Sequence, residues 1–474
     1  MSSRVEGSSS RIRRGRAAGL VAMLALLVLA VPVALALPGA ELWAKRYNGP
    51  GNSSDFANAL AVDPGGSKVF VTGTSRGVGS NSDYATVAYD ASTGAKVWLK
   101  RYNGPANGPD EGHAVGVSPD GSKVFVTGTS RGAGSFFDYA TVAYNTSTGA
   151  KLWVKRYTGP GHGIDSPNAL EVSPSGSRVF VAGSSDGSGT GGGDYATLAY
   201  NASTGARLWV RRYNGPANGF DEVRALQVSP SGSRLFVTGD SGGSTSIDDF
   251  ATVAYSASTG TQLWVKRYNG PGNGDDNAHD VGVSPDGSKV YVTGPSEGST
   301  TYDFATIAYN ASSGAQLWLR RYSGPARGND GSSALGVSPD GSRVFVTGGS
   351  EGSTARIGDY ATVAYGAAHG AKLWAKRYDG GDDDGAAALG VTPDGAQVLV
   401  TGSSVGNDYD YATVAYAAGN GGEQWVKRYD GPAGGQDLVN ALGVSPDSSK
   451  VFVTGESQGT TSADDYATVA YSTR

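Results

Sequence analysis

Two segments of the chain carry polar side chains at the same three-residue spacing, and these are the residues best suited to bind a ligand. They are Asp165, Asn168, Glu171, Asp221, Arg224 and Gln227. Carboxylates, amides and a guanidinium that converge at one place orient a small polar ligand by hydrogen bonds. We predict a ligand site here, although divergence between repeat copies would produce the same pattern without any function.

The histidines offer little for catalysis or metal binding. His113 and His279 share one repeat position, His162 lies in a different loop, and His369 falls in a turn. Their placement suggests neither a Ser, His and Asp set nor a histidine pair at metal-ligand spacing. The sequence therefore predicts no catalytic residues and no metal site.

One aspartate recurs in all eight copies of a long repeat. These residues are Asp83, Asp138, Asp194, Asp249, Asp303, Asp359, Asp410 and Asp465. If a hairpin pairs Tyr89 with Lys96, Asp83 lies opposite Tyr102 and beside Arg101, where an ion pair can form across the strands. We interpret this ring of carboxylates as structural, with metal binding as the alternative.

A second aspartate follows the repeat's tryptophan by twelve residues in seven copies. These residues are Asp55, Asp110, Asp165, Asp221, Asp276, Asp330 and Asp437. Each comes after a turn, where an Asp side chain commonly accepts hydrogen bonds from backbone amides. Calcium needs several oxygens at one point, so a cation site here requires help from neighbouring loops.

The repeat itself predicts the elements that position these residues. The eight tryptophans are Trp43, Trp98, Trp153, Trp209, Trp264, Trp318, Trp374 and Trp425, at spacings of 51 to 56 residues. A unit of this size, repeated many times, indicates a solenoid or a propeller. Each unit holds four short runs rich in Val, Phe, Tyr and Thr, which predict strands. In the second unit they are Ala114–Val117, Lys123–Thr127, Asp138–Tyr144 and Lys151–Tyr157.

Tight turns join the predicted strands. Ser118–Gly121 places Pro and Gly where a hairpin turn needs them, and Asn145–Gly149 connects the third and fourth strands in the same way. In the last copy Ser448 replaces the hairpin glycine. A left-handed backbone at this serine should cost about 1 kcal/mol.

The two ends of the repeat region complete one another. Glu41–Tyr47 is a fourth strand without the first three, and Ala441–Val444, Lys450–Thr454 and Asp465–Tyr471 are three strands without a fourth. A linear stack has no reason to divide a unit in this way, whereas a closed ring leaves no exposed sheet edge at its ends. We therefore predict an all-β fold, an eight-bladed propeller of four-stranded antiparallel blades spanning residues 41–471.

Two motifs indicate family resemblance. The stretch AYDASTGAKVW resembles the repeat of quinoprotein propellers, in which a Trp docks against the neighbouring blade. The strand openings DYA and VFVTGTS resemble the bacterial β-propeller repeats called SBBP. The quinoprotein resemblance implies a dehydrogenase with PQQ and calcium as the alternative function. Many such enzymes have a disulfide of adjacent cysteines beside the quinone, and this chain has no cysteine.

The loops between second and third strands differ most among the copies, and we expect them to share one face of the ring. In the second copy this loop contains Phe136 and Phe137, which we predict to contact a partner. The fourth strands carry a basic pair, from Lys45–Arg46 to Lys427–Arg428. We interpret the pair as protection of an exposed strand edge, with a basic belt for an anionic surface as the alternative.

The first residues differ from the repeats. Four arginines between residues 11 and 16 precede an uncharged apolar run over residues 17–37. This pattern is typical of an export signal, and we predict cleavage after Ala36, with an uncleaved membrane anchor over 17–37 as the alternative. The mild net charge of -5 and the scattered Lys and Arg argue against nucleic acid as a partner.

These features together predict an exported, non-catalytic propeller. We expect a monomer, secreted or located at the cell envelope, that binds a protein or glycan partner through its variable loop face. We expect no cofactor. The alternative is a PQQ-dependent dehydrogenase that oxidises sugars or alcohols.

Overall fold

The structure is a computed structural model that describes residues 36–474, apart from residues 80, 188–191, 245–246 and 353–357. Ala36–Arg474 forms one compact unit. The predicted export signal falls almost entirely on residues 1–35, which lie outside the described residues. The described part of the chain forms no helix of the length and hydropathy that a membrane span requires.

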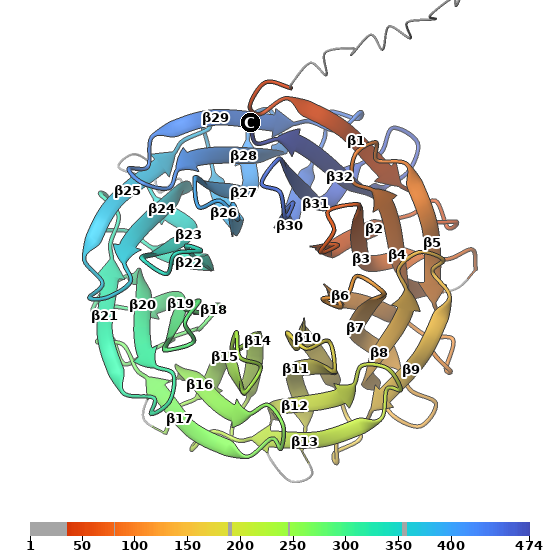
Figure 1. The fold of residues 1–474 in the computed structure, drawn as a ribbon, viewed down its shortest axis with the longest axis horizontal. Helices are drawn as coiled ribbons and strands as arrows, with labels where there is room; N and C mark the ends of the chain where they lie inside the picture. The colour runs from red at the N-terminus through yellow and green to blue at the C-terminus, as the bar shows by residue number, and fades with distance from the viewer. Residues whose placement is uncertain (1–35, 80, 188–191, 245–246, 353–357) are drawn as a thin grey trace, which may run out of the picture. The chain divides into compact units, whose positions relative to one another are not determined.

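In the described residues, thirty-two strands form eight four-stranded antiparallel sheets, arranged as the blades of a ring (Figure 1). The first strands of the blades are β2 (Asp55–Val62), β6 (Asp110–Val117), β10 (Asp165–Val172), β14 (Asp221–Val228), β18 (Asp280–Val283), β22 (Asp330–Val337), β26 (Asp384–Val391) and β30 (Asp437–Val444). The second strands are β3 (Lys68–Arg76), β7 (Lys123–Arg131), β11 (Arg178–Asp186), β15 (Arg234–Gly242), β19 (Lys289–Glu297), β23 (Arg343–Glu351), β27 (Gln397–Val405) and β31 (Lys450–Gln458).

The third strands are β4 (Ser82–Asp90), β8 (Phe137–Asn145), β12 (Gly193–Asn201), β16 (Asp248–Ser256), β20 (Tyr302–Asn310), β24 (Gly358–Gly366), β28 (Tyr409–Ala417) and β32 (Asp464–Ser472). The fourth, outermost strands are β5 (Lys96–Tyr102), β9 (Lys151–Tyr157), β13 (Arg207–Tyr213), β17 (Gln262–Tyr268), β21 (Gln316–Tyr322), β25 (Lys372–Tyr378), β29 (Glu423–Tyr429) and β1 (Glu41–Tyr47). We number the blades 1 to 8 in the order of their first strands.

The N-terminal strand closes the ring. Blade 8 has the strand order β1-β32-β31-β30, and β1 pairs antiparallel with β32, Trp43 lying opposite Ala470. In Figure 1 the two ends of the described chain accordingly lie in the same sector of the ring. The predicted eight-bladed propeller and its mode of closure are confirmed.

The hydrophobic core lies between successive blades. Trp98 of blade 1 packs in one cluster with Val142 and Tyr144 of blade 2. Its indole Nε1 donates a hydrogen bond of 2.8 Å to the carbonyl of Thr146, in the turn of blade 2. The tryptophan therefore docks each blade on the next, as the motif predicts, by burying a large aromatic surface. Seven of the eight indole N–H groups donate a hydrogen bond to the next blade, and that of Trp425 is buried without a hydrogen-bond partner among the described residues.

An ion pair braces the fourth strand of every blade. In blade 1 the Arg101 Nη2 lies 2.9 Å from the Asp83 Oδ2, and all eight Asp residues of the first ring have an equivalent arginine. Arg101 also donates to the carbonyl of Ser75 at 2.6 Å and to the Tyr47 hydroxyl of blade 8 at 3.1 Å. The predicted ion pair is confirmed, and the arginine of each basic pair holds the blade together. Protection of the strand edge by the basic pairs stays a prediction.

The predicted register of this hairpin is wrong by one residue. Tyr89 does lie opposite Lys96, but a bulge between Ala88 and Tyr89 shifts the pairing, so that Tyr84 and not Asp83 lies opposite Tyr102. A bulge places two residues of one strand against one of the other. The Arg101 side chain is long enough to reach Asp83 from this shifted position.

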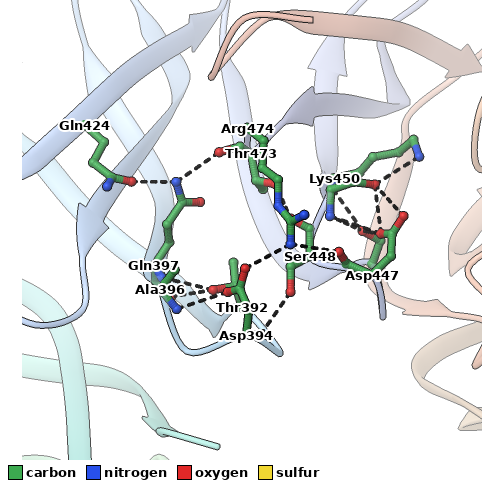
Figure 2. A network of polar contacts seen from close by, with 12 residues as sticks. Thr392, Asp394, Ala396, Gln397, Gln424, Asp447, Ser448, Lys450, Thr473 and Arg474 are labelled. Atoms are coloured by element: carbon green, nitrogen blue, oxygen red, sulfur yellow. Dashed lines mark hydrogen bonds and ion pairs between the residues drawn. The ribbon is translucent and has the colours of Figure 1, made fainter. Parts of the chain in front are cut away.

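Ser448 adopts the predicted left-handed backbone, with a φ of 58°. Its hydroxyl accepts a hydrogen bond of 3.0 Å from the backbone N–H of Asp394 in blade 7, and its carbonyl accepts one from the Thr473 hydroxyl. Figure 2 shows this network, in which Arg474 also lies 2.9 Å from Asp394. The turn that lacks glycine therefore helps to fasten the last blade to its neighbour.

Candidate functional site

A groove opens on the loop face, defined as the side of the ring that carries the loops between second and third strands and the loops between blades. Its volume is about 650 Å³. Its lining residues are Phe136, Gly163, Ile164, Ser166, Ser184, Asp186, Gly192, Gly193, Phe220 and Glu222. They come from blades 2, 3 and 4, and we call this the blade 3–4 groove.

Large apolar side chains form its outer walls. Phe136, Ile164 and Phe220 are exposed by 60%, 60% and 56% and come from three successive blades. Exposed apolar groups that gather around one hollow commonly mark an interaction site, whereas single ones are ordinary. Phe136 is a predicted partner-binding residue, while Ile164 and Phe220 were not singled out from the sequence.

The second ring of aspartates positions these walls. Asp165 Oδ2 accepts a hydrogen bond of 2.6 Å from the Gly159 N–H, and Asp221 Oδ2 accepts one of 2.8 Å from the Gly215 N–H. Both carboxylates are fully buried, and burial raises their pKa. Because neighbouring residues of a strand point to opposite sides, the inward aspartates turn the preceding Ile164 and Phe220 outward.

An eighth member of this second ring escaped the sequence pattern. Asp384 accepts a hydrogen bond of 2.5 Å from the Gly380 N–H, as its counterparts do in other blades. It follows Trp374 by only ten residues, because the loop before blade 7 is shorter. A pattern counted back nine residues from the proline of the following hairpin, Pro393 in this blade, would have found it.

Among the described residues, two clusters of three carboxylates occur, each with one aspartate of the first ring, one of the second ring and one further aspartate. They are Asp359, Asp379 and Asp384, and Asp410, Asp430 and Asp437, with ligand atoms within 4.8 Å of one another. In each cluster an arginine is already paired with the first-ring aspartate, Arg377 with Asp359 and Arg428 with Asp410. These guanidinium groups supply the positive charge that a cation would otherwise bring.

The groove ends toward the channel in a charged network. Glu222 accepts a hydrogen bond of 3.2 Å from Asn168 and lies 3.1 Å from the Arg224 guanidinium. Arg224 in turn lies 2.9 Å from Asp240, which is only 6% exposed. Burial raises the pKa of Asp240 to about 7, although Arg224 opposes the shift. The structure therefore brings the predicted residues Asn168 and Arg224 together at Glu222.

Glu171 and Gln227 form a separate contact between blades 3 and 4. Gln227 Nε2 donates a hydrogen bond of 2.7 Å to Glu171 Oε1, and the Val228 N–H donates to Oε2. Burial raises the pKa of Glu171 to about 8. The six predicted ligand residues thus fall into three groups. Asp165 and Asp221 are buried and accept loop N–H groups, Asn168 and Arg224 contact Glu222, and Glu171 pairs with Gln227. Ligand binding by these residues stays a prediction.

Phe137 lies beside the groove and does not line it. Its backbone forms a parallel bridge with Ile164 of blade 3. The Arg131 guanidinium lies 6.0 Å from the ring centre of Phe136 and 5.9 Å from that of Phe137, within the range of a cation–π contact. Arg131 and the Phe137 backbone therefore support the wall that Phe136 presents.

Side chains at one repeat position, in the first strand or directly before it, connect neighbouring blades. His113 Nδ1 lies 2.8 Å from the carbonyl of Pro167, and His279 Nδ1 lies 3.0 Å from that of Ser332. Asn168 Nδ2 makes the equivalent contact at 2.8 Å with Val223. Two of the four histidines are thereby explained as contacts between blades.

Comparisons with known proteins support the repeat family. A family model described as outer membrane protein assembly factor BamB matches residues 31–191, 82–249, 196–333 and 249–470. No curated protein matches the chain by sequence. The SBBP resemblance has no counterpart in these matches and stays a prediction.

Solved structures share the fold at low sequence identity. BamB from Moraxella catarrhalis is 14% identical with a TM-score of 0.54, over 92% of this chain and 99% of that chain. Chaetomium thermophilum Sqt1 bound to the N-terminus of ribosomal protein L10 is 14% identical with a TM-score of 0.50, over 73% and 82%. Quinohemoprotein alcohol dehydrogenase from Comamonas testosteroni is 12% identical with a TM-score of 0.53, over 92% and 76%. The overlapping family matches extend along almost the whole ring, and the chain therefore belongs to the PQQ-like repeat family described as outer membrane protein assembly factor BamB.

Proposed function

We propose that this protein is a non-catalytic binding module that holds a protein partner in the blade 3–4 groove. The observation that carries the proposal is the convergence of Phe136, Ile164 and Phe220, each more than half exposed, around one hollow. A few large side chains, many of them aromatic, supply most of the binding energy of an interface. These three residues come from loops and not from the blade cores, so their exposure serves no packing need of the ring.

A protein partner suits the groove better than a glycan. The outer walls offer apolar surface, and the polar groups at its inner end are already engaged with one another, as Glu222 is with Asn168 and Arg224. A glycan needs free hydrogen-bonding groups for its hydroxyls. Sqt1, which shares the fold, has been solved with the N-terminus of a ribosomal protein bound, so a ring of this kind can hold a protein segment.

We place the partner at the cell envelope. The predicted export signal and the family's description as an outer membrane assembly factor support this location. The chain's net charge of -5 argues against nucleic acid. We retain the expectation of a monomeric ring attached to the membrane, if at all, through the N-terminal segment.

The described residues do not fit PQQ, the cofactor of the alternative function. PQQ carries three carboxylates, and a site for it needs unpaired cationic groups around a flat cavity. Among the described residues near the channel, Arg224 is shared by Glu222 and Asp240, and Glu171 is held by Gln227. We therefore derive no reaction from this cofactor.

The test is capture of envelope proteins by the purified full chain and by its variant Phe136→Ser/Phe220→Ser. Ile247 is 66% exposed, comes from the loop between β15 and β16 on the same face, and does not line the groove, so Ile247→Ser is the matched control. We expect a protein that the wild type and the control retain and the groove variant loses. Equal capture by the wild type, the groove variant and the control would refute the proposal. Release of the captured species by glycosidase treatment would show that a glycan is bound, and would also refute it.

A further inference from the structure

The chemistry of the groove specifies the kind of segment that binds it, and this inference rests on the proposed function. We propose that the partner inserts a segment in which bulky apolar side chains stand next to a lysine or arginine. Phe136, Ile164 and Phe220 would receive the apolar side chains, and Asp186 and Glu222 the cation.

The ionisable side chains that line the groove are both acidic. They are Asp186 and Glu222, and the guanidinium that contacts Glu222, that of Arg224, also pairs with the buried Asp240. Glu222 and Asp240 therefore share the single guanidinium of Arg224 at the inner end. A cation that entered beside Glu222 would complete this balance, whereas a carboxylate there would meet like charge.

Asp186 places the second negative charge directly beside the apolar wall. Its backbone N–H donates a hydrogen bond of 3.1 Å to the carbonyl of Ile164, which fixes the two residues side by side. A Cβ atom at Gly163 would overlap the Asp186 carboxylate, so the glycine lets this side chain lie directly against the loop. An apolar side chain resting on Ile164 would bring a neighbouring lysine or arginine within reach of Asp186.

Glycines make the same allowance for Phe220. A Cβ atom at Gly192 would lie 2.9 Å from the Phe220 backbone, and one at Gly193 would lie 3.2 Å from the Phe220 ring. The start of the third strand of blade 3 therefore lies close against Phe220 and holds this wall in place. An apolar side chain of the partner could lie there against one side of Phe220.

One basic group near the groove argues for the opposite charge preference. Arg131 lies over Phe136 and Phe137 on the blade 2 side, and it does not line the groove. A segment with acidic residues would have to reach this guanidinium across the Phe136 ring. We favour the basic segment because both lining carboxylates are nearer the hollow, and we make the acidic segment an outcome of the test.

The probe is a phage-displayed random heptapeptide library, selected on the purified full chain and on three variants. Phe220→Ser removes an apolar wall, and Asp186→Lys reverses the charge beside Ile164. Asp382→Lys makes the same charge change at an exposed residue of the loop before blade 7, outside the groove, and serves as the control. Enriched peptides are then synthesised with a fluorescent label and titrated by anisotropy.

We expect enriched peptides to combine Leu, Ile, Phe or Trp with Lys or Arg. They should bind Phe220→Ser and Asp186→Lys about tenfold or more weakly than the wild type, and Asp382→Lys as the wild type does. Selection on Asp186→Lys should shift the enriched charge toward Asp and Glu. Enrichment of acidic peptides on the wild type, or binding that Asp186→Lys leaves unchanged, would overturn the inference.

The two proposals fail in different ways. If the envelope partner depends on Phe136 and Phe220 while the peptides prove acidic or uncharged, the groove binds a protein and the inferred chemistry is wrong. If no partner and no peptide depends on these side chains, both proposals are wrong. Binding of a second copy of the chain would appear as a concentration-dependent increase in mass that Phe220→Ser abolishes, and it would refute the basic-segment inference.

Discussion

Replacing the arginine of one brace tests whether the basic pairs are structural. In blade 1 the change is Arg101→Met, which keeps an unbranched apolar stem but removes the five hydrogen bonds that the guanidinium donates to Asp83, Ser75 and Tyr47. The control is Lys100→Met, the adjacent member of the same basic pair, whose side chain lies against Gly149 of the next blade. Both variants lose one positive charge, and only the first leaves Asp83 without its partner.

The expected magnitude follows from burial. The side chains of Arg101 and Asp83 are 21% and 10% exposed. Removing one partner of a fully buried ion pair costs about 3–5 kcal/mol, and partial exposure of the arginine lets water offset part of this. We expect Arg101→Met to lower the free energy of unfolding by about 2 kcal/mol, and Lys100→Met by less than about 0.5 kcal/mol.

The assay is urea denaturation of the wild type, Arg101→Met, Asp83→Asn and the double variant. If the two groups act as a pair, the double variant should be about 1 kcal/mol more stable than the sum of the single losses predicts. Equal losses for Arg101→Met and Lys100→Met would refute the assignment of the arginine to the brace. Strict additivity would show that Arg101 acts through Ser75 and Tyr47 and not through Asp83.

Three further predictions concern other parts of the ring. Ser448→Gly should leave the melting temperature nearly unchanged, because relief of the left-handed backbone and loss of the hydrogen bond to Asp394 are each worth about 1 kcal/mol and act in opposite directions. Ser448→Ala loses the hydrogen bond alone and should lower the melting temperature. An unchanged melting temperature of Ser448→Ala would contradict this reasoning. Because burial raises the pKa of Asp240 from 3.8 to about 7, the native state keeps a proton that the unfolded state releases, so the stability due to this group falls as pH rises between these values. Asp240→Asn should flatten that part of the pH profile measured by denaturation, and an unchanged slope would contradict the assignment. Adding PQQ and calcium to the purified protein should neither raise its melting temperature nor allow dye reduction by sugars or alcohols. Either effect would support the alternative function as a PQQ-dependent dehydrogenase.

The architecture was predictable because it depends on repeated signals. The number of tryptophans, eight, predicts the number of blades, and the unmatched strand Glu41–Tyr47 predicts how the ring closes. The bulge at Ala88 was not predictable in this way. Both faces of an interior strand are buried, so apolar residues occur at both odd and even positions along it. The sequence pattern therefore does not reveal a one-residue shift in register.

The candidate site was predicted only in part, for a related reason. Phe136 stands out because it lies in a loop that differs strongly among the copies. Ile164 and Phe220 are single-residue differences between copies of the repeat. Their outward orientation follows only from the inward orientation of the aspartate that comes after each of them. Spacing alone also placed Glu171 with Arg224, although the structure pairs these residues with different partners.

The position before the second-ring aspartate explains how such a ring can acquire binding specificity. In the eight blades it is occupied by Ser54, Pro109, Ile164, Phe220, Asp275, Asn329, Asp383 and Gln436. The aspartate that follows is buried and accepts a backbone N–H of the loop, so the loop keeps its shape whatever side chain precedes it. Substitution at this position changes the loop face without disturbing the tryptophan docking or the arginine brace. Adjacent apolar residues in blades 3 and 4 then suffice to give one groove of the loop face apolar walls, whereas the corresponding hollow between blades 6 and 7 has Asn329 and Asp383 at this position.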